Sequence, residues 1–146
     1  MVDDYLDDPE TTRRKFRDGW FYAGDLGILH DAYRLQYLGR SDDLLNIGWN
    51  KFSPDRLEEL VLRSADVGDV GICTVPNADG IEEICVAVSD AQGSDRELVE
   101  RLTHAFRRFQ FGDFHVIKVQ RVPRNANGKI QRDVLKSIAA ESRRRR

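Results

Sequence analysis

Sulfur-containing residues are scarce in this chain of 146 residues, which has only two cysteines and one methionine. So few cysteines argue against a fold held together by several disulfides. Cys73 and Cys85 both lie in stretches rich in β-branched residues, which predicts two buried thiols in a reducing compartment. Neither their spacing nor that of His30, His104 and His115 indicates a metal site or a catalytic group.

Long hydrophobic runs are missing as well. No run approaches the roughly 18 apolar residues that a membrane-spanning helix needs, and no secretory signal is visible. We therefore expect no membrane span and a cytoplasmic protein.

Positive charge is in slight deficit, since the net charge is −2 with 23 basic and 25 acidic residues. Four of the basic residues are the arginines at 143–146, so the rest of the chain is mildly acidic. An acidic body argues against a nucleic-acid-binding domain, which needs a basic face. We expect residues 142–146 to be a solvated, disordered arginine tail rather than an RNA-binding or membrane patch.

The remaining composition, 40% hydrophobic and 33% charged, is typical of a globular protein with its own core. Short apolar stretches separated by turn residues predict strands. They lie at 27–30 and 35–38, which would form a hairpin, and at 70–75, 81–88 and 114–119.

Helical patterns alternate with these strands. Ser53 and Pro54 suit the N-cap and first position of one helix, and Ser94 with Glu97 suits the capping box of a second. A last helix should bury Ile130, Val134, Leu135 and Ile138. The predicted fold class is α+β, a small sheet with packed helices, preceded by a β-hairpin segment.

The most informative stretch is Arg121-Val-Pro-Arg-Asn-Ala-Asn-Gly-Lys-Ile-Gln-Arg132. Gly128 allows a sharp turn, so that Lys129 can project as a compact positive charge. Such a lysine suits reactions in which negative charge builds up on phosphate or carboxylate oxygens. Taken alone, however, a Gly-Lys pair is most often a solvated surface turn.

Two upstream motifs add to this loop. Residues 18–27, Asp-Gly-Trp-Phe-Tyr-Ala-Gly-Asp-Leu-Gly, resemble the Gly-Trp-Phe-x-Thr-Gly-Asp-x-Gly motif of the adenylate-forming superfamily, with Ala23 where the family often has threonine. Residues 39–48, with Ser53-Pro54 and Leu57-Glu58 after them, resemble the next motif, and the lysine loop resembles the last one. The superfamily includes acyl-CoA synthetases, firefly luciferase and the adenylation domains of peptide synthetases. The resemblance covers roughly residues 3 to 136.

The resemblance implies a division of the chain. Residues 1–40 would be the terminal segment of the large N-terminal domain, 41–141 the mobile C-terminal lid domain, and 142–146 the arginine tail. The large domain would supply the phosphate loop and the adenine and carboxylate pockets, and it would be the main partner of this chain. Because residues 1–40 would lack the sheet they normally join, we expect them to be loosely packed or paired with another partner.

The resemblance also implies a reaction: a carboxylate attacks the α-phosphate of ATP, and a thiol of CoA or of a carrier-protein pantetheine then takes the acyl group. Lys129 matches the catalytic lysine that bridges the carboxylate and phosphate oxygens. Asp25 and Arg40 match residues that bind the nucleotide ribose. Mg²⁺ would accompany ATP and be bound mainly by the large domain.

The resemblance implies a place in the hinge or in the thiol loop of the lid for three further residues. Asp42 matches the hinge about which the lid rotates between two orientations. Gly48 and Trp49 lie in the loop that would line the thiol or pantetheine tunnel.

Several alternatives remain open at this point. The resemblance favours an acyl-CoA synthetase that is inactive without its large domain, but an adenylation-domain lid that loads an acyl carrier protein fits nearly as well. A stand-alone docking module without chemistry is a third possibility. The sequence does not identify the carboxylic acid.

Overall fold

The structure is a computed structural model that describes residues 4–109 and 112–145, and of Asp42 only the backbone. The chain divides into two compact units, Met1–Leu44 and Leu45–Arg146. The division falls four residues after the boundary that the motifs predicted. Among the described residues, no helix has both the length and the apolar character that crossing a membrane requires.

The first unit is built from short elements and one longer hairpin. Its elements are α1 (Pro9–Lys15), β1 (Phe16–Arg17), β2 (Trp20–Phe21), β3 (Asp25–Asp31), β4 (Arg34–Arg40) and the 3₁₀ turn η1 (Ser41–Asp43). β1 pairs with β2, and β3 pairs with β4, both antiparallel. The β3–β4 pair is the hairpin predicted from the sequence.

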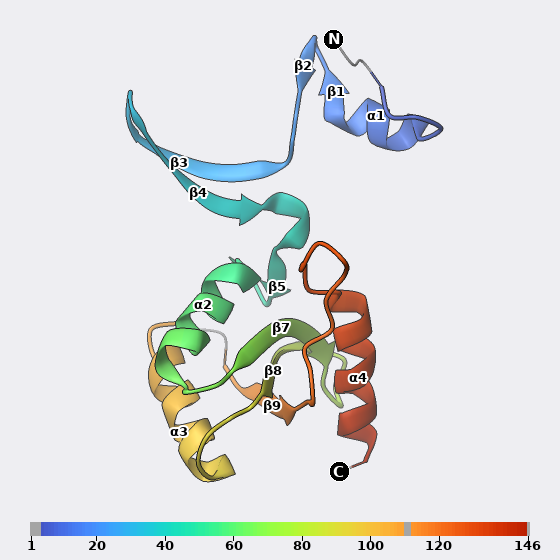
Figure 1. The fold of residues 1–146 in the computed structure, drawn as a ribbon. Coiled ribbons are helices and arrows are strands. Elements are labelled where there is room, and N and C mark those ends of the chain that lie inside the picture. The colour runs from blue at the N-terminus through green and yellow to red at the C-terminus, as the bar shows by residue number, and fades with distance from the viewer. Residues whose placement is uncertain (1–3, 110–111, 146) are drawn as a thin grey trace. The chain divides into compact units, whose positions relative to one another are not determined.

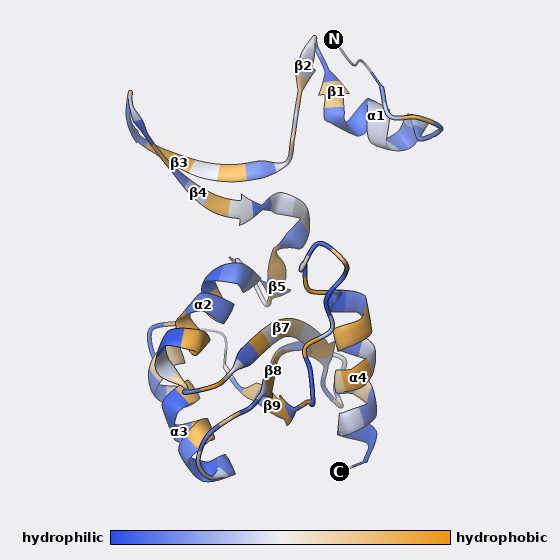
Figure 2. Cartoon of the chain, viewed as in Figure 1, coloured by the Kyte–Doolittle hydropathy of each residue, from blue (hydrophilic) through white to orange (hydrophobic). Residues whose placement is uncertain are grey.

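The first unit buries little of its apolar surface. Every residue of β3 is exposed, and most of β4 is exposed as well. Large side chains such as those of Trp20, Leu29, Tyr33 and Leu35 are exposed. Hydrophobic positions recur along the β3–β4 hairpin (Figure 2). Most of the apolar side chains of this hairpin are therefore exposed.

Among its described residues, the second unit contains a three-stranded sheet, a two-stranded sheet and three helices. Figure 1 shows how the helices and the larger sheet are arranged. The elements of this unit are β5 (Leu45–Ile47), β6 (Asn50–Phe52), α2 (Pro54–Ser64), β7 (Asp69–Pro76), β8 (Glu82–Ser89), α3 (Asp95–Phe106), β9 (Phe114–Lys118) and α4 (Arg132–Arg144). The sheet order is β7-β8-β9, with β7 antiparallel and β9 parallel to β8. The predicted α+β class, with helices packed on a small sheet, is confirmed.

Alternate residues of β7 face two different hydrophobic clusters. Val70 and Ile72 belong to a cluster shared with α2 and α3, whereas Cys73 and Val75 belong to one shared with α4. Because successive side chains of a strand point to opposite faces, α4 lies on one face of the sheet, and α2 and α3 lie on the other (Figure 1). Cys73 faces Cys85 across the β7–β8 pair, and both thiols are buried as predicted.

The helix starts differ in how well they are capped. Ser94 and Glu97 form the complete predicted capping box at the start of α3. Ser53 is the N-cap residue of α2, as predicted, but its side chain makes no capping hydrogen bond. Pro54 at the first position sets the helical backbone there.

The final helix corrects two expectations. Val134 is exposed rather than buried, and the buried residues of α4 are Leu135 and Ala139. α4 also includes residues 142–144, where a disordered tail was expected. Arg143 donates hydrogen bonds to the Pro76 carbonyl (2.9 Å) and to Glu83 (2.6 Å), so acceptors on β7 and β8 stabilise this last helical turn.

Candidate functional site

The lysine loop, residues 123–131, is a closed turn between β9 and α4. The Asn125 carbonyl accepts a hydrogen bond from the Gly128 amide (2.9 Å), and the Asn125 amide donates to the Lys129 carbonyl (2.9 Å). Oδ1 of Asn125 also accepts from the amides of Asn127 (3.0 Å) and Lys129 (2.9 Å). Gly128 has φ +78°, a conformation that other residues rarely adopt. Lys129 therefore lies, exposed, on a turn that one asparagine organises.

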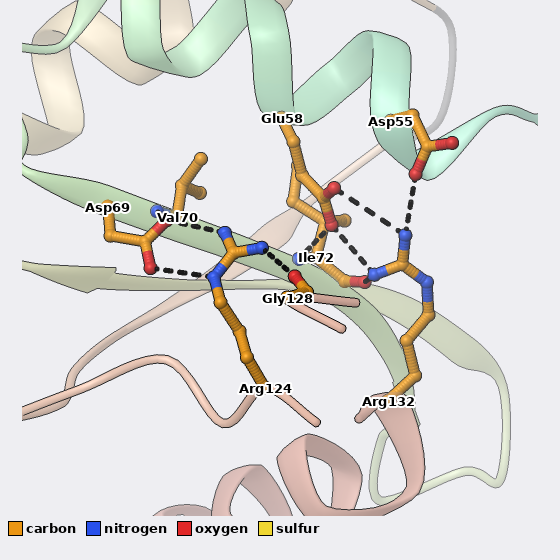
Figure 3. Close-up of polar contacts among 8 residues, drawn as sticks. All are labelled: Asp55, Glu58, Asp69, Val70, Ile72, Arg124, Gly128 and Arg132. Atoms are coloured by element: carbon orange, nitrogen blue, oxygen red, sulfur yellow. Dashed lines mark hydrogen bonds and ion pairs between the residues drawn. The ribbon is translucent and has the colours of Figure 1, made fainter. Parts of the chain in front are cut away.

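Arg124 fastens the first half of the loop to the start of β7. Its guanidinium donates to Asp69 through Nε (3.2 Å) and Nη2 (2.7 Å), and through Nη1 to the Gly128 carbonyl (2.8 Å) (Figure 3). Asp69 in turn accepts a hydrogen bond from the Val70 amide (2.8 Å). One side chain thus joins the residue before Lys129 to the sheet.

Arg132, the first residue of α4, directly follows the loop and anchors its C-terminal end. Nη1 donates to Oε1 of Glu58 (2.8 Å) and reaches the Ile72 carbonyl (3.4 Å), while Nη2 donates to Asp55 (2.9 Å) (Figure 3). Glu58 Oε1 also accepts from the Ile72 amide (2.9 Å). The side chains of Arg132 and Glu58 are only 17% and 11% exposed. This pair joins the starts of α2 and α4 to the outer edge of β7.

We call the Arg124–Asp69 and Arg132–Glu58 pairs the two clamps of the loop. The pKa values of their carboxylates are shifted in opposite directions. Burial raises the pKa of Glu58, although Arg132 and the Ile72 amide oppose this effect. Burial also acts to raise the pKa of Asp69, but the hydrogen bonds from Arg124 and the Val70 amide outweigh it, and the pKa of Asp69 lies below its ordinary value.

Gly71, between the two clamps, provides the contact surface for the base of the loop. A Cβ at this position would lie 2.8 Å from Cγ1 of Val122 and 2.9 Å from Cδ2 of Leu135. Both side chains are fully buried. The lack of a side chain at Gly71 therefore allows the chain on either side of the lysine loop to pack directly on β7.

Asp25 and Arg40 come together in the first unit. They are paired residues of the β3–β4 hairpin, and Nη1 of Arg40 lies 3.5 Å from Oδ1 of Asp25. The Ala23 carbonyl accepts hydrogen bonds from Arg40 Nη2 (3.1 Å) and from Lys15 Nζ (3.3 Å). The side chains of Asp25 and Arg40 are 50% and 39% exposed, so both remain accessible to a ligand.

The other predicted residues lie in turns. Asp42 lies in η1, two residues before the end of the first unit. Gly48, with φ +57°, and Trp49 form the two-residue turn between β5 and β6, a position that favours glycine. The indole of Trp49 is fully exposed.

Sequence analysis assigned no role to Arg124, Arg132, Glu58 or Asp69. One signal for Glu58 was present, because Pro54, Glu58, Val61 and Ala65 are spaced 4, 3 and 4 residues apart and so share one helical face. A carboxylate on an otherwise apolar face predicts a buried partner.

No protein-family model matches this chain. Among curated proteins, it is 32% identical over 135 residues to an oxalate–CoA ligase of Arabidopsis thaliana, covering 90% of this chain and 26% of that protein. The chain spans about a quarter of the length of the curated relatives it matches.

Solved structures agree with these sequence matches. The o-succinylbenzoate CoA synthetase MenE from Bacillus subtilis, in complex with its acyl-adenylate intermediate, matches with a TM-score of 0.74 and 26% identity over 91% of this chain and 28% of that one. ATP-bound MatB from Rhodopseudomonas palustris matches with a TM-score of 0.71 and 28% identity over 92% of this chain and 27% of that one. The fold, the three motifs and these matches together lead to one conclusion: the chain belongs to the adenylate-forming superfamily and corresponds to a C-terminal part of its CoA-ligase-like members.

Proposed function

We propose that this chain is the C-terminal part of an ATP-dependent acid–thiol ligase, and that Lys129 is its catalytic residue for adenylation. In that step a carboxylate oxygen bonds to the α-phosphorus of ATP, and pyrophosphate leaves. The ammonium group of Lys129 would lie between the two reactants and offset the negative charge that develops on their oxygens.

One observation carries this proposal. Lys129 is exposed on a tight turn whose two ends are both attached to β7 through Arg124 and Arg132, and matching proteins include CoA ligases and a structure that holds an acyl-adenylate. A flexible surface lysine would need no such support, because it would have no fixed place to reach. The positions of Arg124 and Arg132 on either side of Lys129 therefore favour a lysine that acts at a defined point.

Asp25 and Arg40 are proposed to bind the ribose of ATP. The carboxylate of Asp25 has two oxygens that can each accept a hydrogen bond from one hydroxyl of a vicinal diol. The contact of Arg40 with both Asp25 and the Ala23 carbonyl would hold that carboxylate in one orientation. Their half-exposed side chains are compatible with a ligand of this kind.

The second half-reaction is proposed to use the β5–β6 turn. After rotation about Asp42, the turn with Gly48 and Trp49 would face the acyl-adenylate, and a thiol would attack the acyl carbon with release of AMP. The acceptor we propose is CoA, as in the named relatives. The pantetheine of an acyl carrier protein is the alternative acceptor, and it would meet the same turn.

The partner we propose is a large N-terminal adenylating domain, which would bind most of ATP and its Mg²⁺. The exposed apolar side chains of the first unit, among them Trp20, Leu29 and Leu35, support this proposal because they offer a surface that a larger sheet could cover.

The test uses this chain together with a large adenylating domain from a related CoA ligase, supplied as a separate chain. Pyrophosphate exchange with a panel of carboxylic acids should require both chains. We expect Lys129→Ala to lower the exchange rate by about 10²–10³-fold. Lys136→Ala is the matched control, since Lys136 is an exposed lysine on α4, and it should leave the rate unchanged.

Three results would separate the alternatives. An unchanged rate in Lys129→Ala contradicts the catalytic role. Thioester formation with a carrier protein but not with CoA would identify the alternative acceptor. If the chain binds a partner whose affinity depends on neither Lys129 nor ATP, and no exchange occurs, it is a docking module.

A further inference from the structure

The short segment Asp69–Ile72 of β7 connects at three points with the lysine loop and the residues that flank it. Asp69 binds Arg124, Gly71 makes room for Val122, and Ile72 is linked through Glu58 to Arg132. Three residues of one strand, Asp69, Gly71 and Ile72, thus carry the contacts that hold both ends of the loop.

We propose that Glu58 and Arg132, together with Asp69 and Arg124, are positioning residues that hold Lys129 at a fixed place relative to β7. This proposal rests on the proposed function of Lys129, because only a reacting lysine needs a defined position. The four residues act through the loop and are not proposed to touch ATP or the carboxylate.

The geometry of Arg132 favours this role over simple ion pairing. Its guanidinium contacts two carboxylates on α2 and a backbone carbonyl on β7, so α4 is held against two other elements at the residue where the loop ends. Lys129 precedes Arg132 by three residues. A shift at Arg132 would therefore move the loop directly, with few backbone bonds between them to absorb it.

Glu58 also occupies the outer edge of the sheet. β7 pairs with β8 on one side only among the described strands, and at Ile72 its free edge is covered by Glu58 on the amide and by Arg132 on the carbonyl. The two side chains that satisfy the backbone hydrogen-bonding groups of Ile72 at this edge therefore also hold the loop in place. Misplacing a reacting group by about 1 Å can cost about 10²-fold in rate.

Arg124 constrains the loop through a hydrogen bond to another residue of the loop. Its bond to the Gly128 carbonyl constrains the residue that directly precedes Lys129, while the two bonds to Asp69 prevent the guanidinium from rotating away. The fork geometry of arginine allows both contacts at once, which a lysine at this position could not provide.

The first experiment measures amide hydrogen exchange of the full chain by NMR. In Arg132→Gln and in Glu58→Gln, the amides of Gly128, Lys129 and Gln131 should exchange about tenfold faster, while β8 amides keep their rates after correction for global stability. Glu59→Gln is the matched control, because its carboxylate pairs only with exposed Arg63 in the described structure and should change no loop amide.

A second variant covers the case in which Arg132→Gln fails to fold. Arg124→Gln removes the more exposed clamp and should speed exchange at Lys129 in the same way. Loop amides that keep their rates in every folded clamp variant overturn the proposal. An equal acceleration of loop and β8 amides overturns it too, since that result means a general loss of stability.

The kinetic constants of the reconstituted enzyme distinguish a positioning role of these residues from a purely structural one. Arg132→Gln and Arg124→Gln should lower kcat for pyrophosphate exchange by about tenfold or more, and leave KM for the acid unchanged. Unchanged kcat with a faster-exchanging loop overturns the positioning role. If Lys129→Ala retains full activity, the proposed function fails, and this is recognised independently of the exchange data.

Discussion

The ion pair between Glu58 and Arg132 should couple α2 to α4 more strongly than any exposed pair of this protein. The perturbation is a double-mutant cycle made of Glu58→Ala, Arg132→Ala and the double variant. Both side chains are largely buried, at 11% and 17% exposed, so solvent screens their interaction only weakly. The cycle isolates the pair from the other contacts that each side chain makes.

The structure sets the expected magnitude. Arg132→Ala leaves the buried carboxylate of Glu58 with the Ile72 amide as its one remaining hydrogen-bond donor among the described residues, a situation that costs about 3–5 kcal/mol. The lower end, about 3 kcal/mol, is expected because only one arginine–Glu58 contact is short (2.8 Å) and the other is 3.5 Å. Removing both partners avoids the uncompensated charge, and the coupling energy should therefore be about 2 kcal/mol.

The assay is urea unfolding followed by far-UV circular dichroism, which reports mainly on α2, α3 and α4 of the second unit. It should be performed at pH 8, because burial raises the pKa of Glu58 and the carboxylate must be ionised. The control cycle is the exposed i,i+4 pair of Arg96 and Glu100, which should couple by about 0.3–0.5 kcal/mol. A coupling for Glu58 and Arg132 no larger than this control would refute the reasoning.

Three other predictions concern the same unit. Gly71→Ala should destabilise it by about 1–3 kcal/mol, because the new Cβ would overlap the packed side chains of Val122 and Leu135, and equal urea midpoints for the two proteins would contradict this. Asp69 has a lowered pKa in the folded state, so its stabilising effect is present above its unfolded pKa and is lost as the pH falls through the folded value. The stability difference between the parent and Asp69→Asn should therefore be constant from about pH 7 to 5 and shrink below about pH 4, and a constant difference down to pH 3 would exclude this role. Trp49→Ala should change the free energy of unfolding by less than about 0.5 kcal/mol because the indole is fully exposed, while thioester formation in the reconstituted enzyme should fall; a large loss of stability would indicate a packing role instead.

The sequence by itself determined the local features of the protein. Turn residues and apolar alternation located the β3–β4 hairpin and the strands β7 and β8, and the Ser94–Glu97 capping box marked the start of α3. These features depend on residues within a few positions of one another, so the sequence is sufficient to predict them. The motifs around Asp25, Gly48 and Lys129 likewise indicated the superfamily.

The candidate site was predicted only in part. Lys129 and the turn at Gly128 followed from the motif, and Asp25 and Arg40 do lie together in one hairpin. That Arg40 contacts Asp25 directly was not predicted, because the register of the hairpin decides which residues face each other. The catalytic and binding roles of these residues stay predictions until the reconstituted enzyme is measured.

Only the tertiary structure decided what holds the lysine loop. Arg132 and Glu58 are separated by 74 positions, and nothing local to either residue specifies the other as its partner. The same holds for the exposure of Val134, which depends on the rotation of α4 against the sheet and not on its helical period alone. Burial and long-range pairing arise when elements pack against one another, because each then removes water from the other, and the sequence pattern of a single element does not contain that information.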